Sequence, residues 1–281
     1  MKYNLLIVFL LLITIILFGC EKGIDNSEMG TLTIKLTDTP FPIDTVQEAN
    51  VTINKIEIRK AQSESDGNPF LVLSEDEFNY NLLDLQNGIT ADLVTMEVPV
   101  GDYDLVRLYV SSASIKLKDE TVYDLEVPSG DATGIKVFVD PSIRVVGGLT
   151  TELVLDFDVS QSFIPQGDIF TPAGISGFNF KPVIRAANIS TSGSIEGNVL
   201  DSDSNDLEGA SIWIEDNGNT YTASSDNQGY YMLPYIPAGT YTVNATKDDT
   251  PPYDTVYVEN VEVIAGNLIQ LDDIVLTQEQ P

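Results

Sequence analysis

Two carboxylates placed two residues apart are the most obvious reacting groups in the chain. Asp156 and Asp158 lie in the strand-like run Leu153–Val159, whose apolar residues alternate with them. Both carboxylates therefore share one face of the predicted strand, roughly 6.5–7 Å apart. Retaining glycosidases place two carboxyl groups about 5–5.5 Å apart and inverting ones about 6.5–9.5 Å apart, so the spacing permits acid–base hydrolysis. Every strand with aspartate at i and i+2 has this spacing, however, and nothing in the sequence identifies a nucleophile or a substrate pocket.

A second acidic group, Asp201–Asp206, begins in the pattern of a calcium loop. Calcium is a hard cation that takes carboxylate and carbonyl oxygens, and acidic or amide residues occupy the first, third and fifth positions here. The pattern then fails, because Asp206 stands where an EF-hand needs glycine and Ile212 where it needs a bidentate glutamate. Asp201, Asp203 and Asp206 are therefore candidate calcium ligands, and the alternative is a polar hairpin loop. No other cofactor is predicted.

The residues that are missing exclude several classes of chemistry. The 281 residues include no histidine and one cysteine, so no Ser-His-Asp triad, no internal disulfide and no cysteine-based zinc site can form. The chain has 43 acidic and 14 basic residues and a net charge of −29, which argues against a nucleic acid partner. Acidity of this kind is typical of a solvated surface.

The single cysteine directly follows an apolar N-terminal segment. The run Leu5–Phe18 is almost entirely apolar and shorter than the roughly 20 residues of a membrane-spanning helix, as in a secretory signal peptide. It ends in Leu17-Phe18-Gly19-Cys20, which resembles the lipobox of bacterial lipoproteins. The resemblance implies cleavage after Gly19 and acylation of Cys20, with palmitate among the acyl chains, and hence attachment to a membrane. A free buried thiol or a plain membrane anchor is the alternative.

The segment after the cysteine indicates where the protein resides. Residues 1–19 are the predicted lipoprotein signal peptide, and residues 20–30 form an acidic tether without hydrophobic periodicity. Glu21, rather than aspartate, follows the cysteine. By resemblance to lipoprotein sorting, this favours the outer membrane of a Gram-negative cell envelope over retention in the inner membrane. The periplasmic and the surface face are both open.

Aromatic residues are concentrated in the last third of the chain. The only tryptophan, Trp213, is followed by seven tyrosines, of which Tyr230, Tyr231 and Tyr235 are the closest together. Exposed rings stack on the apolar faces of sugars, so these four residues are candidate ligand-binding groups for a neutral glycan. The alternative is that most of these rings belong to a hydrophobic core.

The hydrophobic period from residue 31 onward is two, which predicts strands. Leu32, Ile34 and Leu36 alternate with polar residues, whereas a change of parity near Asn54-Lys55 predicts a β-bulge or a bend. Only the stretch Asp84–Met96 could hold a helix. Short strands separated by Gly- and Pro-rich turns predict an all-β chain made of two antiparallel β-sandwich-like domains.

Two families resemble the two halves. The segments "GTLTIKLTDTP", "VPVGDYDLVRLYV", "VPSGDATGIKVF", "LVLDFDVSQSF" and "FKPVIRA" resemble the bacterial lipoprotein domain of unknown function of family 4382, over residues 31–187. The segments "GSIEGNVLDSDSNDLEGASIWIED" and "TASSDNQGYYMLPYIPAGTYTVNATKDD" are similar to the carboxypeptidase regulatory-like domain, over residues 190–278. The second resemblance implies a seven-stranded Greek-key sandwich related to transthyretin and to collagen-adhesin B repeats. The first brings no catalytic residues.

These observations support three functional interpretations. The leading one is a non-catalytic, lipid-anchored cell-envelope protein that acts as a binding or adhesion module, with neutral glycans or envelope proteins as partners. A structural envelope spacer is the second interpretation. A carboxylate-dependent hydrolase is the third and the weakest, because the usual catalytic groups are missing.

Overall fold

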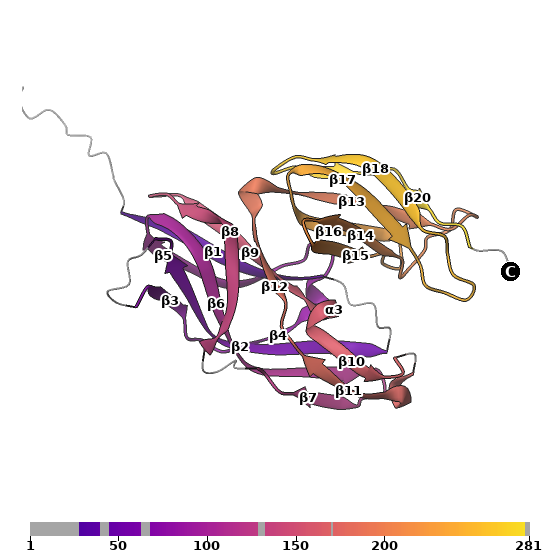
Figure 1. The fold of residues 1–281 in the computed structure, drawn as a ribbon, viewed down its shortest axis with the longest axis horizontal. Helices are drawn as coiled ribbons and strands as arrows, with labels where there is room; N and C mark the ends of the chain where they lie inside the picture. The colour runs from indigo at the N-terminus through magenta and orange to yellow at the C-terminus, as the bar shows by residue number, and fades with distance from the viewer. Residues whose placement is uncertain (1–27, 40–44, 63–67, 129–132, 170, 279–281) are drawn as a thin grey trace, which may run out of the picture.

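The computed structural model describes residues 28–39, 45–62, 68–128, 133–169 and 171–278 and is built almost entirely of strands (Figure 1). The all-β prediction is therefore confirmed. Cys20 and the rest of residues 1–27 lie outside the described residues. Among the residues that are described, no helix has both the length and the apolar character needed to cross a membrane.

The first part of the chain, residues 28–188, packs around one hydrophobic core and is called the N-terminal module. Its strands are β1 (Met29–Thr39), β2 (Val46–Lys60), β3 (Phe70–Ser74), β4 (Phe78–Asn81), β5 (Ala91–Pro99), β6 (Gly101–Leu117), β7 (Val122–Leu125), β8 (Ile135–Val145), β9 (Thr150–Asp158), β10 (Phe163–Gly167), β11 (Ile175–Phe180) and β12 (Ile184–Asn188). Its described helical elements include the single turns η1 (Leu82–Leu85), α3 (Val159–Ser162) and η2 (Pro172–Gly174).

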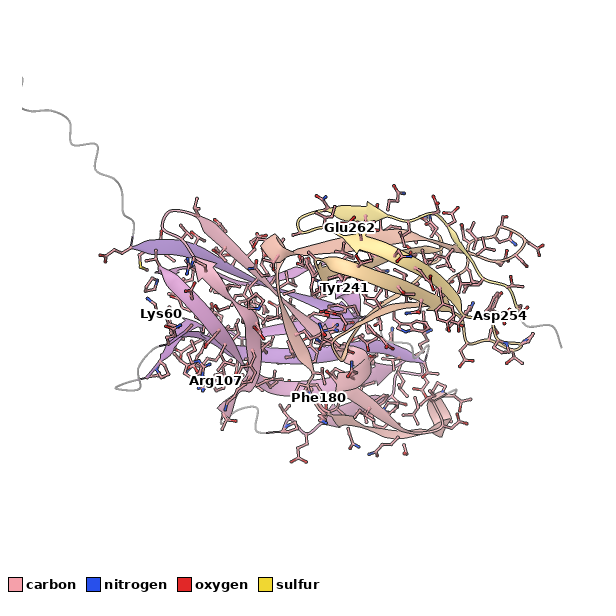
Figure 2. All side chains as sticks on the ribbon, turned by 45° about the horizontal axis from the view of Figure 1, so that its top comes forward. Lys60, Arg107, Phe180, Tyr241, Asp254 and Glu262 are labelled. Atoms are coloured by element: carbon pink, nitrogen blue, oxygen red, sulfur yellow. The ribbon has the colours of Figure 1, made fainter. Side chains whose placement is uncertain are left out.

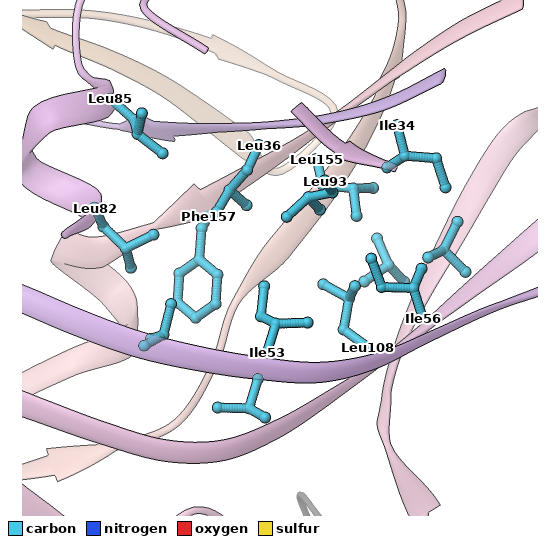
Figure 3. Packing of buried hydrophobic residues seen from close by; sticks show 14 of the residues in the cluster. Ile34, Leu36, Ile53, Ile56, Leu82, Leu85, Leu93, Leu108, Leu155 and Phe157 are labelled. Carbon is cyan, nitrogen blue, oxygen red and sulfur yellow. The ribbon is translucent and has the colours of Figure 1, made fainter. Parts of the chain in front are cut away.

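Two sheets enclose this core. One has the order β12-β9-β1-β5, and the other runs β3-β2-β6 with β4 on β2 and with β7 and β8 on β6. The predicted alternation places Leu32, Ile34 and Leu36 of β1 fully inside, where they meet Ile53 of β2 and Phe157 of β9 (Figure 3). Alternate apolar residues from two facing sheets are the physical basis of a β-sandwich.

Two local expectations have different outcomes. The predicted irregularity near Asn54-Lys55 is confirmed, because the register of β2 against β6 shifts there and Ile53 and Ile56 are both buried. The stretch Asp84–Met96, the only one that the sequence left open for a helix, is a strand over its second half. That stretch holds only the end of η1 and most of strand β5, because pairing with β1 along nearly its whole length stabilises an extended conformation there.

The last part of the chain, residues 192–278, packs around a second core and is called the C-terminal module. The turn η3 (Ile189–Thr191) leads into it. Its strands are β13 (Ser192–Leu200), β14 (Ser211–Asp216), β15 (Asn219–Ser224), β16 (Tyr230–Pro237), β17 (Gly239–Thr246), β18 (Val256–Val263), β19 (Leu268–Gln270) and β20 (Ile274–Val275). Because β19 and β20 both pair with β13 in parallel, they form one interrupted strand, and the predicted seven strands are present.

The two modules share one strand topology. In the N-terminal module, β1 lies between antiparallel β5 and parallel β9; in the C-terminal module, β13 lies between antiparallel β16 and parallel β19. In the facing sheet of the N-terminal module, β2 pairs with β3 and β6, and β8 pairs with β6 on its other side. In the facing sheet of the C-terminal module, β14 pairs in the same way with β15 and β17, and β18 pairs with β17 on its other side. Among the described residues, the parallel pairs are thus those of β1 with β9 and of β13 with β19 and β20, and the other pairs are antiparallel.

The correspondence extends to single hydrogen bonds. In the N-terminal module, Gly148 N–H donates to the Met29 carbonyl at 3.0 Å and Thr31 N–H donates to the Leu149 carbonyl at 2.9 Å. The same two bonds recur at 2.8 and 2.9 Å in the C-terminal module. The equivalent pairs are Met29/Ser192, Thr31/Ser194, Val146/Ile264, Gly148/Gly266 and Leu149/Asn267.

A Pro-x-Gly-x-Tyr motif also occurs once in each module, at the turn between the two sheets. The Tyr103 hydroxyl donates to the Pro99 carbonyl at 2.7 Å, and the Tyr241 hydroxyl donates to the Pro237 carbonyl at 2.8 Å. A tyrosine hydroxyl that donates a hydrogen bond to the backbone a few residues upstream is called a tyrosine corner, and it stabilises the connection between the two sheets of a β-sandwich. Figure 2 labels Tyr241 in the C-terminal module and Phe180 in the N-terminal module.

Candidate functional site: the cleft between the modules

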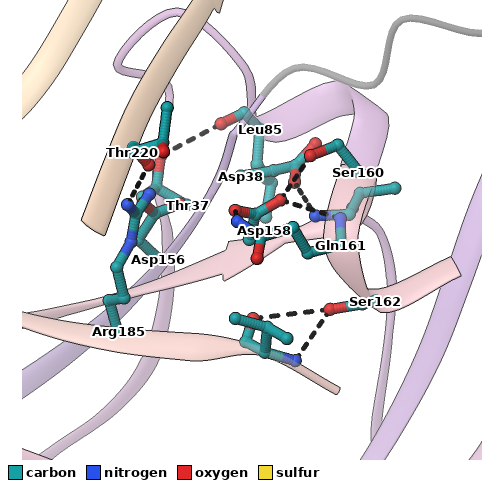
Figure 4. A network of polar contacts seen from close by, with 12 residues as sticks. Thr37, Asp38, Leu85, Asp156, Asp158, Ser160, Gln161, Ser162, Arg185 and Thr220 are labelled. Atoms are coloured by element: carbon teal, nitrogen blue, oxygen red, sulfur yellow. Dashed lines mark hydrogen bonds and ion pairs between the residues drawn. The ribbon is translucent and has the colours of Figure 1, made fainter. Parts of the chain in front are cut away.

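Arg185 connects the two modules. It lies on β12, directly opposite Asp156 on β9, and its Nη2 is 2.5 Å from the Asp156 carboxylate (Figure 4). Its Nη1 donates to the Thr220 carbonyl on β15, so the guanidinium bonds to both modules. The guanidinium also lies over the Tyr221 ring, 4.6 Å from the ring centre, in a cation–π contact.

The charges beside this contact are largely buried. Burial opposes the charge of Arg185, but the Asp156 carboxylate more than offsets it and raises the pKa of the guanidinium. Burial also raises the pKa of Tyr221. Deeper in the same network, burial and the nearby Asp156 charge raise the pKa of the Asp38 carboxyl well above its usual value.

A cleft of about 530 Å³ opens beside Arg185, between the modules. Its walls are formed by β8, β9 and β12 on one side and by residues of the C-terminal module on the other. Aromatic and proline rings line it from both modules, with Tyr221, Pro234, Tyr235 and Pro237 from the C-terminal module and Phe138 and Pro141 from the N-terminal module. Its polar lining includes the side-chain amides of Asn188, Asn217 and Asn219.

Tyr235 is held in an unusual backbone conformation in this cleft. Its φ is +56°, in the left-handed region that non-glycine residues rarely adopt, although it lies within strand β16. Burial raises the pKa of its hydroxyl. Such conformations occur at binding and active sites, where the surrounding structure maintains them.

Comparison with known families assigns both modules. A family model described as "Domain of unknown function (DUF4382)" matches residues 29–182, which is more than half of the chain. The chain belongs to the DUF4382 family. A second model, the carboxypeptidase regulatory-like domain, matches residues 194–277 and follows the DUF4382 domain, as the sequence resemblance predicted. A comparison with curated proteins found no match.

Several solved structures are similar to parts of this DUF4382 protein. A type II cohesin–X-dockerin complex from Acetivibrio cellulolyticus has 26% identity over 30% of this chain and 56% of that chain, with a TM-score of 0.24. The minor pilin GBS52 of Streptococcus agalactiae has 10% identity, covers 89% of this chain and 97% of that chain, and has a TM-score of 0.26. BcpA, the major pilin subunit of Bacillus cereus, has 15% identity over 90% and 71%, with a TM-score of 0.24. TM-scores of this size carry no argument about what the DUF4382 protein does.

The four candidate ligand-binding aromatics are not brought together. Tyr235 lines the cleft. Tyr231 is fully buried in the core of the regulatory-like domain, so its ring offers no surface to a ligand. Tyr230 donates its hydroxyl to Glu196 at 2.9 Å, and burial, helped by that carboxylate, raises its pKa to about 12. Trp213 is half-buried on β14, between the buried Ile212 and Ile214, and it does not line the cleft.

The two candidate carboxylate groups have structural roles. Asp158 is buried and caps α3 by accepting from Gln161 N–H at 3.0 Å, while Asp156 is paired with Arg185, so each of the two carboxylates has a structural partner. Asp201 accepts from the backbone N–H groups of Asp203 and Asn205, both at 2.9 Å, which makes it the closing residue of a hairpin loop. Across the described residues, no group of three or more acidic side chains is placed to hold a metal ion, and this includes the three calcium candidates.

Sequence reasoning missed Arg185 and Phe138. A basic residue inside the strand-like segment "FKPVIRA" of an acidic chain is a signal that a buried ion pair exists, but its partners come from two other strands, β9 and β15, and cannot be identified from the segment itself. Phe138 is 66% exposed within β8, and alternation alone does not show which partner module lies beside it.

Proposed function

We propose that this protein is a non-catalytic, lipid-anchored binding protein of the cell envelope, and that the cleft between its modules binds a neutral glycan. The observation that carries the proposal is the lining of the cleft by rings from both modules. Its volume of about 530 Å³ lies within the range of roughly 300–1,000 Å³ that is typical of small-molecule sites, which often form between domains.

The chemistry of the cleft fits a sugar. Flat rings such as those of Phe138 and Tyr235 stack on the apolar faces of pyranoses, and the asparagine amides both donate to and accept from hydroxyl groups. The charged residues of the lining are two bases and three acids: Lys136, Arg185, Asp140, Asp156 and Asp216. An anionic ligand gains little there and is repelled by the net charge of −29, so a neutral glycan is favoured.

A titration of neutral oligosaccharides against the chain from residue 30, guided by a glycan array run with and without calcium, tests this proposal. The decisive variant is Tyr235→Asn, because asparagine tolerates a positive φ and the variant removes only the ring. We expect at least a tenfold loss of affinity. Tyr257→Ala is the matched control, since this ring is 63% exposed and does not line the cleft. Equal loss in both variants would contradict the cleft as the site.

Sugar binding at Trp213, outside the cleft, would give a different result in these titrations. If Trp213→Ala abolishes sugar binding while Tyr235→Asn does not, the ligand lies on the outer face of the sheet that contains β14. If no neutral glycan binds to a folded chain, the spacer interpretation is favoured. That interpretation is supported by the tandem repetition of one strand topology, which suits a protein that separates two surfaces.

The anchor in this proposal is Cys20. Its support is the lipobox-like Leu17–Cys20 behind the apolar run Leu5–Phe18, with Glu21 favouring the outer membrane. Acyl chains contribute about 0.8 kcal/mol for each buried methylene, so several chains give stable attachment. Radioactive palmitate should label the parent chain and not Cys20→Ala, and the variant should leave the membrane fraction. Labelling of both chains would contradict acylation at this residue.

A further inference from the structure

Three apolar side chains are exposed together at one end of the N-terminal module. Met29, Val146 and Leu149 are 39%, 45% and 60% exposed, and we call this group the N-terminal tip. Met29 begins β1, and the other two belong to the turn between β8 and β9. The hydrogen bond from Gly148 N–H to the Met29 carbonyl holds strand and turn together. Apolar groups clustered on a rigid turn indicate an interaction surface.

The charged residues around the tip are nearly balanced in sign, unlike those of the whole chain. Glu28 and Lys60 are connected through Val100, whose N–H donates to the Glu28 carbonyl and whose carbonyl accepts from Lys60 Nζ, both at 2.9 Å. Arg144 is paired with Asp102 at 2.8 Å. Two acids and two bases therefore lie close to the tip, and the exposed Glu97, opposite Thr31 on β5, adds one more acid, in a chain with net charge −29. An anionic surface repels this end least.

The tip also lies where the tether enters the fold. The start of β1 and the β8–β9 turn lie at the end of the molecule that is remote from the C-terminal module (Figure 1). Lys60 is labelled at this same end in Figure 2. Only a short segment separates Cys20 from Glu28. At roughly 3.5 Å per extended residue it spans at most about 30 Å, so an anchor at Cys20 keeps the tip close to the bilayer.

We propose that the N-terminal tip inserts into the interfacial region of a phospholipid bilayer and orients the molecule on it. The inference rests on the proposed lipid anchoring, and it assigns a second membrane contact to the folded part of the chain. The tip is small, so its insertion is weak by itself and depends on the covalent anchor that brings it to the surface. With the tip at the bilayer, the cleft and the C-terminal module point away from it.

The C-terminal module supplies a matched control. Its equivalent turn exposes Ile264 and Leu268 at 49% and 53%, with the same backbone hydrogen bonds. The two turns therefore have similar apolar exposure and geometry and differ in their distance from the tether. If the two turns differ in their contact with lipid, the cause is therefore their distance from the tether and not a difference in hydrophobicity.

The test uses the mature chain, residues 20–281, coupled through its single cysteine to a maleimide lipid in vesicles of phosphatidylethanolamine and phosphatidylglycerol. In a Trp213→Phe background, Val146→Trp and Ile264→Trp each introduce one fluorophore, at equivalent positions of the two turns that are 45% and 49% exposed. Brominated acyl chains should quench the tryptophan introduced at position 146 several-fold more than the one introduced at position 264. Equal quenching at the two positions, or none at position 146, would overturn the proposal.

Deuterium exchange on the unsubstituted chain gives a second measurement that no substitution can disturb. Coupling to vesicles should slow exchange of the Gly148 and Leu149 amides and leave the Gly266 and Asn267 amides unchanged. No slowing at the first turn would contradict insertion. Because the anchor is attached chemically, these results do not depend on acylation in the cell or on sugar binding, so failure here is distinguishable from failure of the proposed function.

Discussion

Arg185 is the residue on which the contact between the modules depends most directly. Its partners are the Asp156 carboxylate, the Thr220 carbonyl and the Tyr221 ring, and its side chain is only 17% exposed. Removing one member of a buried ion pair leaves the other charge without compensation. We therefore expect Arg185→Met to lower the free energy of unfolding by about 3 kcal/mol, measured by urea denaturation.

The control for this variant is another arginine–aspartate pair. Arg144→Met removes the pair with Asp102, in which the two side chains are 73% and 40% exposed, so water replaces the lost interaction and stability should change little. Equal destabilisation by the two variants would show that charge loss, and not the buried contact between modules, is responsible.

Asp38 should make stability depend on pH. Burial, followed by the Asp156 charge, raises the pKa of this carboxyl well above its usual value, while N–H donation from Val159 opposes the shift. The folded chain therefore keeps this proton at a pH where the unfolded chain has lost it. The stabilisation is complete below the unfolded-state pKa of about 3.9 and is lost as the pH rises through the raised folded-state pKa.

Asp38→Asn should therefore gain stability relative to the parent as the pH rises from 5 to 8, in urea midpoints measured at each pH. Asp102→Asn is the control, because the hydrogen bond from Arg144 lowers the pKa of Asp102, this carboxyl stays ionised from pH 5 to 8, and the difference from the parent should not change with pH in that window. A difference between Asp38→Asn and the parent that does not change with pH would contradict the predicted titration.

At the scale of elements, the repeated turn depends on a glycine in each module. A Cβ at Gly193 would lie 2.5 Å from the Ile264 carbonyl oxygen, and a Cβ at Gly30 would meet the equivalent Val146 carbonyl even more closely. The backbone must move to accept either, at a cost of about 1–3 kcal/mol. We expect Gly30→Ala and Gly193→Ala to lower the melting temperature, measured by circular dichroism.

Gly177→Ala tests whether strand glycines in general are intolerant. Its Cβ would meet only the end of the Gln166 side chain, at 3.5 Å, which is ordinary contact. The melting temperature of this variant should stay close to that of the parent. If Gly193→Ala were equally harmless, the close approach of strand and turn would not be a constraint on the fold.

Elements whose hydrophobic pattern is local could be predicted from the sequence, and contacts between distant elements could not. The alternation of Leu32, Ile34 and Leu36 defines β1 without further information, and Asp226–Gly229 defines a turn in which Gly229 has a φ of +72°. In contrast, the sequence of β5 does not distinguish a strand from a helix, because its pairing with β1 is not encoded within the segment itself. The cleft cannot be predicted for the same reason, since Arg185 and Tyr235 come to line one cleft only through tertiary structure.

On the scale of the whole molecule, the two cores determine how the chain divides. The hydrophobic cluster of the C-terminal module contains residues from β13 to Leu276 only, and its largest buried side chains include Tyr231 and Leu233. The contacts to the N-terminal module are few by comparison and include the Arg185 bond to Thr220. A separate core with both of its sheets complete should fold without its neighbour.

A fragment of residues 190–281 should therefore show β-type circular dichroism and a cooperative melt, as small single domains do. Its melting temperature should lie somewhat below that of the same module in the full chain, because the fragment lacks Arg185 and exposes Tyr221 and Tyr235 to water.

Ile214→Ala in the fragment removes a fully buried side chain and should lower the free energy of unfolding by about 2–5 kcal/mol, whereas Tyr257→Ala, at an exposed position, should have little effect. A disordered spectrum for the fragment, or equal effects of the two substitutions, would mean that the C-terminal module depends on the N-terminal one for its fold.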